Sequence, residues 1–218
     1  MGRRRPSAAL ILQSFRGLGD DEAGPSATDS GTFPNTSHNG SLLVLVAAAM
    51  SDSGLPTISA PLTAGMIWTL AVTGNSVGGP FARRVVIYYS RNSPSIASGT
   101  VWQITATRVG ATETAIQACI FEFGPCDGTL DQTASNSGTS SVPATANLIT
   151  TAKDVIVCGE VGNSTTIAGA GYTLGPSLPN TPAQGSTQYQ LNIASGSIPT
   201  AFGSSVAFWA EAAAAFKV

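Results

Sequence analysis

Apolar and polar residues alternate with a period of two along most of this 218-residue chain. Between residues 66 and 73, one face carries Met66, Trp68, Leu70 and Val72, and the residues between them form the other face. Successive side chains of a β-strand point to opposite faces of a sheet, so this alternation predicts strands. The same pattern predicts about ten or eleven short strands, at residues 10–15, 41–49, 66–73, 85–89, 101–107, 116–123, 147–151, 155–160, 171–174, 188–194 and 205–217.

Clusters of turn-forming residues separate these segments, for example Asp52-Ser53-Gly54, Asn92-Ser93-Pro94 and Asp127-Gly128. Short strands at regular spacing, without helices between them, predict an all-β protein with an antiparallel β-sandwich of jelly-roll or immunoglobulin-like type. Residues 211–215 have high helix propensity because four of them are alanine. Strict alternation continues through them, however, which favours a long closing strand.

Residues 1–40 differ from the rest of the chain, since they hold eight of its 22 charged side chains. We expect residues 1–40 to form an N-terminal arm with a basic tail, one strand at residues 10–15 and a long loop, and residues 41–218 to form the β-sandwich domain. The polar stretch 133–146 is expected to be a surface excursion. The apolar run 8–12 is shorter than a signal-peptide core, and the run 42–50 is about half of a transmembrane helix, so we expect neither feature.

The composition excludes several classes of protein. Only 10% of the residues are charged, against about 25% in an average soluble domain, and polarity comes instead from 49 serines and threonines. A net charge of −2 offers no general attraction for nucleic acid, and a hydrophobic content of 43% is too high for a disordered chain. We therefore expect one compact domain with no nucleic-acid partner and no membrane contact.

Three cysteines, Cys119, Cys126 and Cys158, give an odd count, and no two of them have the spacing of metal ligands. Cys119 and Cys158 lie in apolar alternating stretches, so we expect buried free thiols. One disulfide among the three is the alternative. No metal or cofactor is expected.

Catalytic motifs are missing from the sequence. The single histidine, His38, lies in a polar loop, and no nucleophile elbow, phosphate-binding loop or zinc-binding motif is present. A pair of carboxylates is the remaining catalytic option, with Glu122, Glu160 and Glu211 as candidates. We expect Glu122 and Glu211 to face solvent or a neighbouring subunit. The segment 127–131 offers two acids to Ca²⁺, but a turn is the favoured interpretation.

Aromatic and basic residues suggest two kinds of binding site. Trp68 and Trp102 offer a surface for stacking sugars, but their in-phase apolar neighbours favour packing in the core. Basic residues near the N-terminus favour contact with a protein partner, because the arginine fork suits carboxylates at interfaces. The predicted partner-binding residues of the arm are Arg3, Arg4, Arg5, Phe15 and Arg16.

Nine segments between residues 40 and 218 resemble, in the same order, a β-sandwich module that recurs in tailed-phage virion proteins and in bacterial surface proteins. The motifs are patterns of small residues and carry no catalytic signature. The resembling segments are residues 40–46, 57–59, 65–71, 86–89, 121–124, 130–134, 150–154, 168–173 and 209–217.

Together with the composition, this resemblance implies a non-enzymatic virion structural protein. The preferred hypothesis is a capsid decoration, or cement, protein of a bacteriophage that stabilises the particle through contacts with the major capsid protein or another virion protein. Its expected state is a homo-oligomer, with a trimer favoured, and its expected location is the virion, assembled in the host cytoplasm. The alternative is a tail-fibre, spike or carbohydrate-binding receptor-recognition module.

Overall fold

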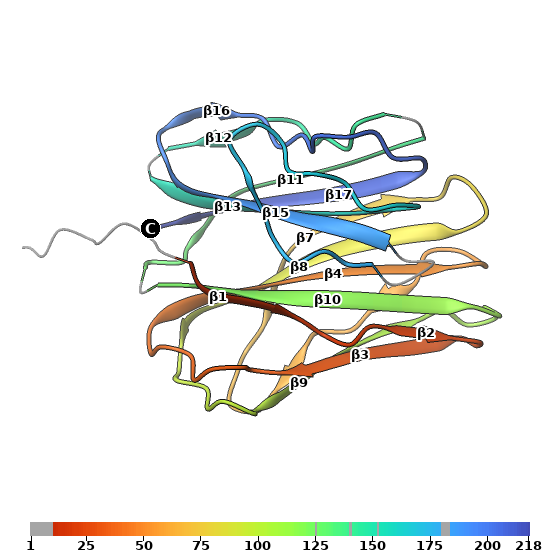
Figure 1. The fold of residues 1–218 in the computed structure, drawn as a ribbon, viewed down its shortest axis with the longest axis horizontal. Helices are drawn as coiled ribbons and strands as arrows, with labels where there is room; N and C mark the ends of the chain where they lie inside the picture. Colours follow the sequence, from red (N-terminus) through yellow and green to blue (C-terminus); the bar gives the residue numbers. More distant parts are fainter. Residues whose placement is uncertain (1–10, 125, 140, 152, 180–183) are drawn as a thin grey trace, which may run out of the picture.

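The computed structural model describes residues 11–124, 126–139, 141–151, 153–179 and 184–218, and this part of the chain is all-β (Figure 1). Neighbouring strands pair antiparallel throughout. The predicted antiparallel β-sandwich class is therefore confirmed. The described residues form seventeen strands, more than the ten or eleven predicted.

The central sheet has the strand order β1-β10-β4-β8-β7, and β2 pairs with the first residues of β10. Its strands are β1 (Ile11–Arg16), β2 (Asp20–Glu22), β4 (Ser41–Ser51), β7 (Thr69–Ser76), β8 (Ala82–Ser93) and β10 (Thr114–Phe123).

Two outer sheets and one strand pair complete the fold. The β9 sheet contains β3 (Ser26–Thr32), β5 (Thr57–Ile58), β6 (Leu62–Thr63) and β9 (Val101–Thr107). The β17 sheet contains β11 (Leu130–Gly138), β13 (Asp154–Gly162), β14 (Thr173–Leu174), β15 (Gln184–Ile193) and β17 (Trp209–Lys217). The remaining pair is β12 (Leu148–Thr150) with β16 (Gly196–Ile198).

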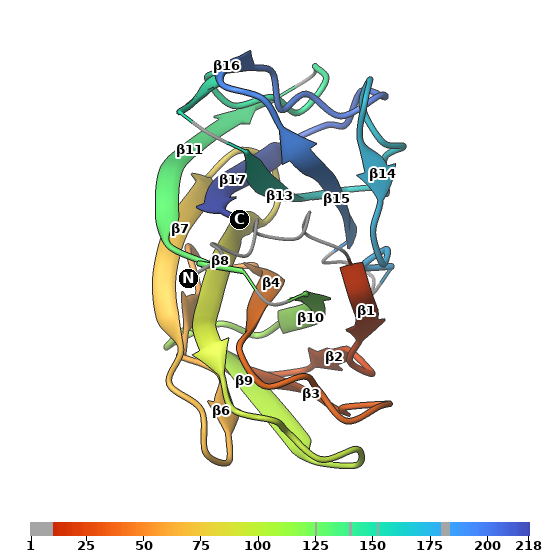
Figure 2. The same ribbon diagram turned by 90° about the vertical axis from the view of Figure 1, so that its left-hand side faces the viewer.

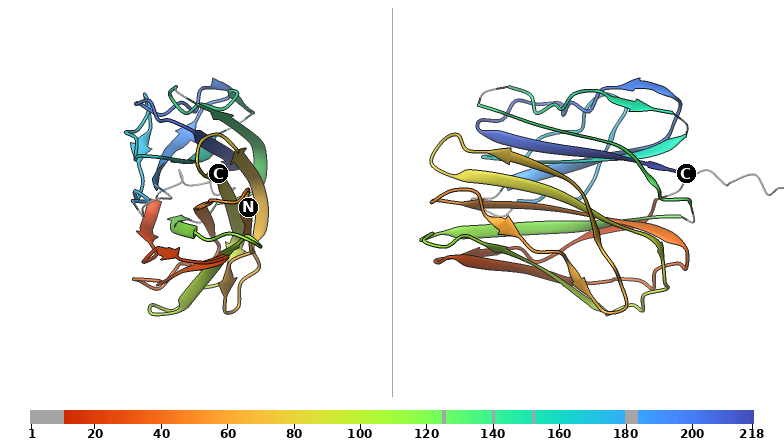
Figure 3. Two further views of the ribbon diagram at one scale, coloured as in Figure 1. Left: turned by 90° about the vertical axis from the view of Figure 1, so that its right-hand side faces the viewer. Right: turned by 180° about the vertical axis from the view of Figure 1, so that it is seen from behind.

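These sheets are stacked in layers (Figure 2). The β9 sheet packs on one face of the central sheet and the β17 sheet packs on the other. The β12–β16 pair lies over the outer face of the β17 sheet, where Leu148 joins Ile156 and Ala213 in a third apolar cluster. At one side of the molecule β7 lies beside β11, as Figures 2 and 3 show from opposite directions.

The stacking explains why some strands have apolar residues on both faces. Every residue of β4, β10 and β13 is buried. In β4, Leu43 and Leu45 face the β9 sheet, whereas Val44 and Val46 face the β17 sheet. A strand that is covered on both sides reads as a continuous apolar run, as residues 42–50 do. The alanine-rich end is also a strand, as predicted, and its small side chains lie between closely packed layers.

Residues 11–40 contain three strands, where one strand and a long loop were predicted. The predicted strand is β1, which pairs with β10. The predicted loop contains β3, which pairs with β9 over its whole length. Alternation is hidden in β3 because its inward side chains are Ala27, Asp29 and Gly31, with a single apolar residue among them.

The polar stretch 133–146 was predicted to be a surface excursion, but its first residues belong to β11. This strand forms the edge of the β17 sheet and exposes most of its polar side chains. An edge strand with so few apolar residues gives no periodic signal. The described residues contain no helix of the length and apolarity needed to span a membrane.

Candidate functional site

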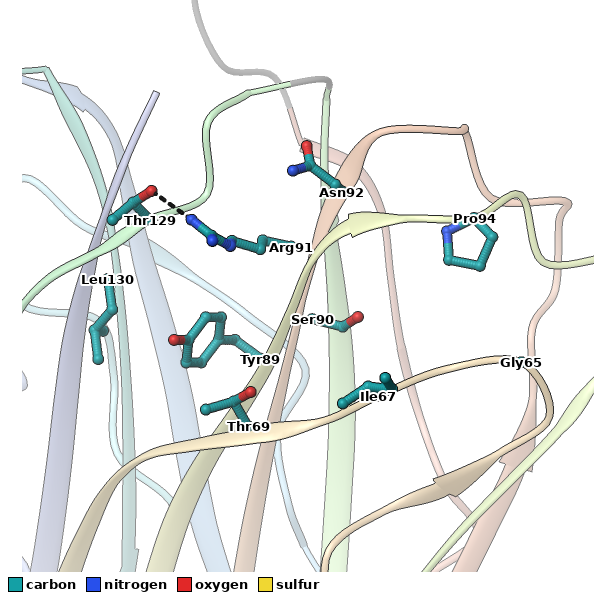
Figure 4. Close-up of a pocket in the computed structure, with 10 residues that line it drawn as sticks. All are labelled: Gly65, Ile67, Thr69, Tyr89, Ser90, Arg91, Asn92, Pro94, Thr129 and Leu130. Carbon is teal, nitrogen blue, oxygen red and sulfur yellow. Dashed lines mark hydrogen bonds between the residues drawn. The ribbon is translucent and has the colours of Figure 1, made fainter.

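A surface pocket of about 560 Å³ lies at one end of β8 (Figure 4). Tyr89 and Arg91 project from the same side of β8 toward Thr129 and Leu130, whereas Ser90 projects away from them. The lining residues come from three segments of the chain and are Gly65, Ile67, Thr69, Tyr89, Ser90, Arg91, Asn92, Pro94, Thr129 and Leu130. Hydroxyl and amide groups, one aromatic ring and one charge therefore meet in one hollow.

A β-bulge shapes this end of β8. The pairing with β4 passes from Leu43↔Ser90 to Ser41↔Ser93, so Arg91 and Asn92 share one opposing position. Asn92 adopts a left-handed backbone conformation with φ of 48°. Bulges occur often beside functional sites, where they redirect side chains, and a non-glycine residue at positive φ is a local strain of the kind found at such sites.

Arg91 is held by a short hydrogen-bond relay. Its Nη1 donates to Thr129 Oγ1 at 3.0 Å, and Thr129 Oγ1 donates to Asp127 Oδ1 at 2.5 Å. Gly128 makes this approach possible, because its φ is +65° and a Cβ there would lie 3.1 Å from Arg91 Cβ. Among the described residues, one of the five guanidinium N–H donors is used, in this bond to Thr129, and the others remain open to a ligand.

The ring of Tyr89 is fixed from behind. It packs against Phe216 with ring centroids 5.2 Å apart, at the edge of the core between the central and β17 sheets. Ile67 at the rim is 84% exposed. The pocket thus has a rigid aromatic wall and an open, solvent-facing side.

Two glutamates lie face to face inside the β17 sheet. Glu160 of β13 and Glu211 of β17 are register partners, and both are completely buried. Thr166 Oγ1 donates to Glu160 Oε1 at 3.4 Å, but Glu160 Oε2 and both Glu211 oxygens have no donor at hydrogen-bond geometry in the described residues. The expectation that Glu211 faces solvent or a neighbouring subunit is wrong, because the segment around Phe202 covers this side of the sheet.

Burial raises the pKa of both carboxyl groups well above the ordinary value of 4.5. For Glu160, the hydroxyls of Ser186 and Thr166 oppose this rise. For Glu211, the Thr200 hydroxyl opposes it from outside hydrogen-bond geometry, while the nearby Glu160 adds to it. Two like charges at facing positions of neighbouring strands repel each other strongly in a buried site. We therefore expect both groups to be protonated over much of the acidic pH range.

Glu122 is buried as well, so the expectation that it faces solvent or a neighbouring subunit is also wrong. Its Oε1 accepts the Ser41 hydroxyl at 2.8 Å and the His38 backbone N–H at 2.7 Å, and its Oε2 accepts Gln13 Nε2 at 2.5 Å. His38 Nδ1 lies 3.4 Å from Oε1. In a catalytic triad the histidine stands between serine and acid, whereas here the acid stands in the middle. The cluster fastens residues 13–41 to β10.

The acids of the segment 127–131 do not form a cation site. Asp127 accepts the Thr129 hydroxyl, whereas Asp131 Oδ2 lies 2.6 Å from Lys217 Nζ. Lys217 Nζ is also 3.7 Å from the buried Asp154, whose pKa burial raises to about 6. Within the described ranges, no group of three or more His, Cys, Asp or Glu side chains is placed to hold a metal ion.

The two tryptophans proposed for sugar stacking are core residues. Trp102 is fully buried and Trp68 is 9% exposed, and both pack between the central and β9 sheets. Neither ring offers a face to a sugar, so the stacking alternative at these positions is wrong and the core interpretation is confirmed. Cys119 and Cys158 are buried, as predicted, and burial raises the pKa of the Cys119 thiol to about 12.

The predicted arm residues fall into two groups. Arg3, Arg4 and Arg5 lie outside the described residues. Phe15 and Arg16 belong to β1 and line a second hollow of about 420 Å³ together with Leu18, which is 88% exposed, and Val101. Phe15 also packs edge-on against the buried Phe33, with ring centroids 5.1 Å apart.

Next to this hollow lies the outer face of the β9 sheet, which consists of hydroxyl, amide and apolar groups. Thr28 and Thr105 form a cross-strand hydrogen bond at 3.0 Å, and Val101 and Leu62 are exposed. None of its outward side chains is charged. They are Ser26, Thr28, Ser30, Thr32, Thr57, Leu62, Val101, Gln103, Thr105 and Thr107.

Sequence reasoning missed the pocket at the end of β8 and the outer face of the β9 sheet as sites. The pocket depends on a bulge and on Thr129, which is distant in sequence, and the face depends on the unpredicted β3. Comparison with protein-family models, with curated proteins and with solved structures found no match for the chain. The resemblance to phage virion modules therefore stays a prediction from the sequence segments given above.

Proposed function

We propose that this protein is a non-enzymatic structural protein of a virion, a capsid decoration protein that binds its particle through the outer face of the β9 sheet. The observation that carries the proposal is the absence of charge from the outward side chains of that face, together with the exposed Val101 and Leu62. The resemblance to phage virion modules supplies the particle as the context.

An uncharged face suits a permanent interface. Removing an ion from water costs several kcal/mol unless it is well paired. Removing a hydroxyl or amide group from water costs less free energy, and such a group can form hydrogen bonds across the interface. The cores of stable interfaces are correspondingly depleted of charged residues. Serine and threonine on neighbouring strands also give a surface of even height, which favours close packing against a second flat surface.

The hollow at the edge of this face provides an anchor. Leu18 and Val101 are exposed apolar residues, and Phe15 and Arg16 lie beside them. A few residues usually carry most of the binding energy of an interface, and arginine is enriched among them. The proposed partners are the major capsid protein and, within a trimer, copies of this chain. A tail-fibre or spike protein differs from this proposal in its copy number per particle.

The positions of the glutamates support a role without catalysis. Glu160 and Glu211 are sealed from solvent, whereas a glycosidase needs its two carboxyl groups on either side of an open cleft. Glu122 is occupied by donors from Gln13, His38 and Ser41. The three candidate acids therefore serve the fold in this proposal.

The test compares two glutamine substitutions. Gln103→Lys places a charge on the outer face of the β9 sheet, and Gln132→Lys places the same charge on the exposed side of β11. Each variant is added to particles that lack the protein, and its copy number on gradient-purified particles is measured. We expect Gln103→Lys to lose most of its occupancy and Gln132→Lys to bind like the unaltered chain. Equal occupancy of the two variants would contradict the proposed surface.

A further inference from the structure

We infer that the pocket at the end of β8 binds a carboxylate-bearing sugar, with Arg91 as the residue that holds the carboxylate. This site shares no residue with the outer face of the β9 sheet, so it stands or falls independently of the proposed packing role. The inference rests on four observations: the charge of the pocket, the donors it leaves unused, its aromatic wall and the strained bulge that builds it.

The charge of the pocket selects an anion. Arg91 is the only charged residue among the ten that line it. In the described part of the chain Arg91 forms no ion pair; the ion pairs there join His38 to Glu122 and Lys217 to Asp131 and Asp154. Asp127 is linked to Arg91 through the Thr129 hydroxyl and so orients it. A planar guanidinium with free N–H groups matches the two oxygens of a carboxylate.

The remaining lining selects a polyhydroxylated ligand. Thr69 and Thr129 contribute hydroxyls on the same side of β8 as the ring of Tyr89, and Ser90 and Asn92 add a hydroxyl and an amide elsewhere in the lining. Sugars combine apolar C–H faces with many hydroxyls, so an aromatic wall with polar groups at its border suits them. A simple anion would use Arg91 but would leave most of this lining without a partner. The volume of about 560 Å³ lies within the usual range for small-ligand sites.

The β-bulge at Arg91 and Asn92 gives up regular strand pairing, which indicates that this end of β8 has a role besides pairing with β4. A regular continuation of β8 would place Arg91 and Asn92 on opposite faces, in register with β4. The bulge interrupts this register, and Asn92 accepts positive φ. Such strain costs about 1 kcal/mol or more and persists where the local geometry has a use.

The experiment is a calorimetric titration of the full chain with three probes: methyl β-glucuronide, methyl β-glucoside and acetate. The first two have the same ring and differ in the carboxylate, and the third carries the carboxylate without the ring. We expect the glucuronide to bind roughly tenfold or more tightly than either of the others, since a charge-assisted bidentate pair and the ring contacts are both required.

Variants identify the residue responsible. Arg91→Gln is expected to weaken glucuronide binding roughly tenfold or more, and Arg91→Lys to restore part of it because a point charge replaces the fork. Arg84→Gln is the matched control, since Arg84 lies on β8 and bonds to Asn75 outside the pocket. Circular dichroism checks that each variant is folded. Equal binding of glucuronide and glucoside, equal binding of acetate and glucuronide, or equal loss in the Arg91 and Arg84 variants would each overturn the inference.

Discussion

The two outer sheets bury one face against the same central sheet, yet they treat their other face in opposite ways. The β9 sheet leaves its outer face open and lines it with hydroxyl, amide and apolar groups. The β17 sheet is covered by the β12–β16 pair and by the segment around Phe202, and it holds Glu160 and Glu211 beneath that cover. The β9 sheet thus presents a row of polar side chains on its open face, whereas the β17 sheet encloses two glutamates beneath its cover.

This contrast separates two uses of polarity. On the β9 sheet, polar groups keep an open surface soluble and remain available to a partner. On the β17 sheet, the buried acids require the cover to stay closed and the carboxyl groups to stay protonated. The β9 sheet is therefore the better candidate for an interface, and the β17 sheet the better candidate for pH-dependent stability.

The largest predicted effect breaks the packing of the β17 sheet on the central sheet. A Cβ at Gly159 would lie 2.3 Å from Val46 Cγ1 and 3.3 Å from Val85 Cγ2, both in a fully buried layer. We expect Gly159→Ala to lower the free energy of unfolding by about 3 kcal/mol, measured by urea denaturation. In the β9 sheet, the Cβ of Gly31→Ala would lie 3.0 Å from the Trp102 ring. We expect this variant to lower the free energy of unfolding by only about 1 kcal/mol. Equal losses would contradict the difference in packing.

The second prediction concerns the facing glutamates. Because their folded-state pKa lies well above 4.5, the folded protein binds more protons than the unfolded chain, and stability falls as the pH rises above about 4.5. The double variant Glu160→Gln, Glu211→Gln removes this loss. We expect it to be about 2 kcal/mol more stable than the unaltered chain at pH 8 and nearly equal at pH 4.

Glu122→Gln is the matched control for that measurement. Its carboxylate accepts three hydrogen bonds from Gln13, His38 and Ser41 on its two oxygens. In the variant, the NH2 group replaces one of these acceptor oxygens and lies opposite a hydrogen-bond donor. We expect a loss of about 1–2 kcal/mol at pH 8, with a sign opposite to that of the double variant. A gain in Glu122→Gln, or a loss in the double variant at pH 8, would refute the division of the acids into partnered and unpartnered groups.

The third prediction concerns Asp29, which lies on the inner face of the β9 sheet. Its carboxylate accepts the Gly19 N–H at 2.8 Å and the Ala118 N–H at 2.6 Å. It therefore links β3 to β10 and to the short segment between β1 and β2. Burial raises its pKa to about 6, so its contribution to stability declines as the pH rises from about 3.8 through 6. We expect Asp29→Asn to lose about 1 kcal/mol at pH 5 and to show a flatter pH profile in urea denaturation.

The smallest predicted effect lies on the open face itself. Thr28→Val removes the hydroxyl pair with Thr105 but keeps the shape and the strand preference of the residue. We expect a change of less than about 0.5 kcal/mol in stability and no loss of particle occupancy, because a valine adds apolar surface to the proposed interface. A loss of more than about 1 kcal/mol would mean that the open face is part of the stabilising framework.

Alternation predicted the strands that face a core on at least one side. Each of the eleven predicted segments overlaps a strand, including the alanine-rich β17. The missed strands are short, lie at sheet edges or, as in β3, have Asp29 and Gly31 at inward positions. Stacking of more than two sheets could not be derived, because a run such as residues 42–50 does not say which layers cover it.

The site residues were harder to predict than the strands. Glu122 and Glu211 were placed on the outward face because alternation assigns only one face to a core, whereas both faces of their strands are covered. The pocket brings Arg91 next to Thr129, 38 residues away, through a bulge that alternation does not reveal. The local signal in the sequence was the Asn92-Ser93-Pro94 cluster, where the structure places Asn92 at positive φ.

The central claim is that the outer face of the β9 sheet is buried in the particle. Hydroxyl-radical footprinting tests it directly, because Leu62 and Val101 on this face and Ile149 and Ile167 elsewhere are all exposed in the isolated chain. Oxidation of each residue is compared between the free protein and the protein bound to purified particles. We predict strong protection of Leu62 and Val101 with unchanged oxidation of Ile149 and Ile167. Protection of Ile149 and Ile167, with Leu62 and Val101 oxidised as in the free protein, would contradict the claim.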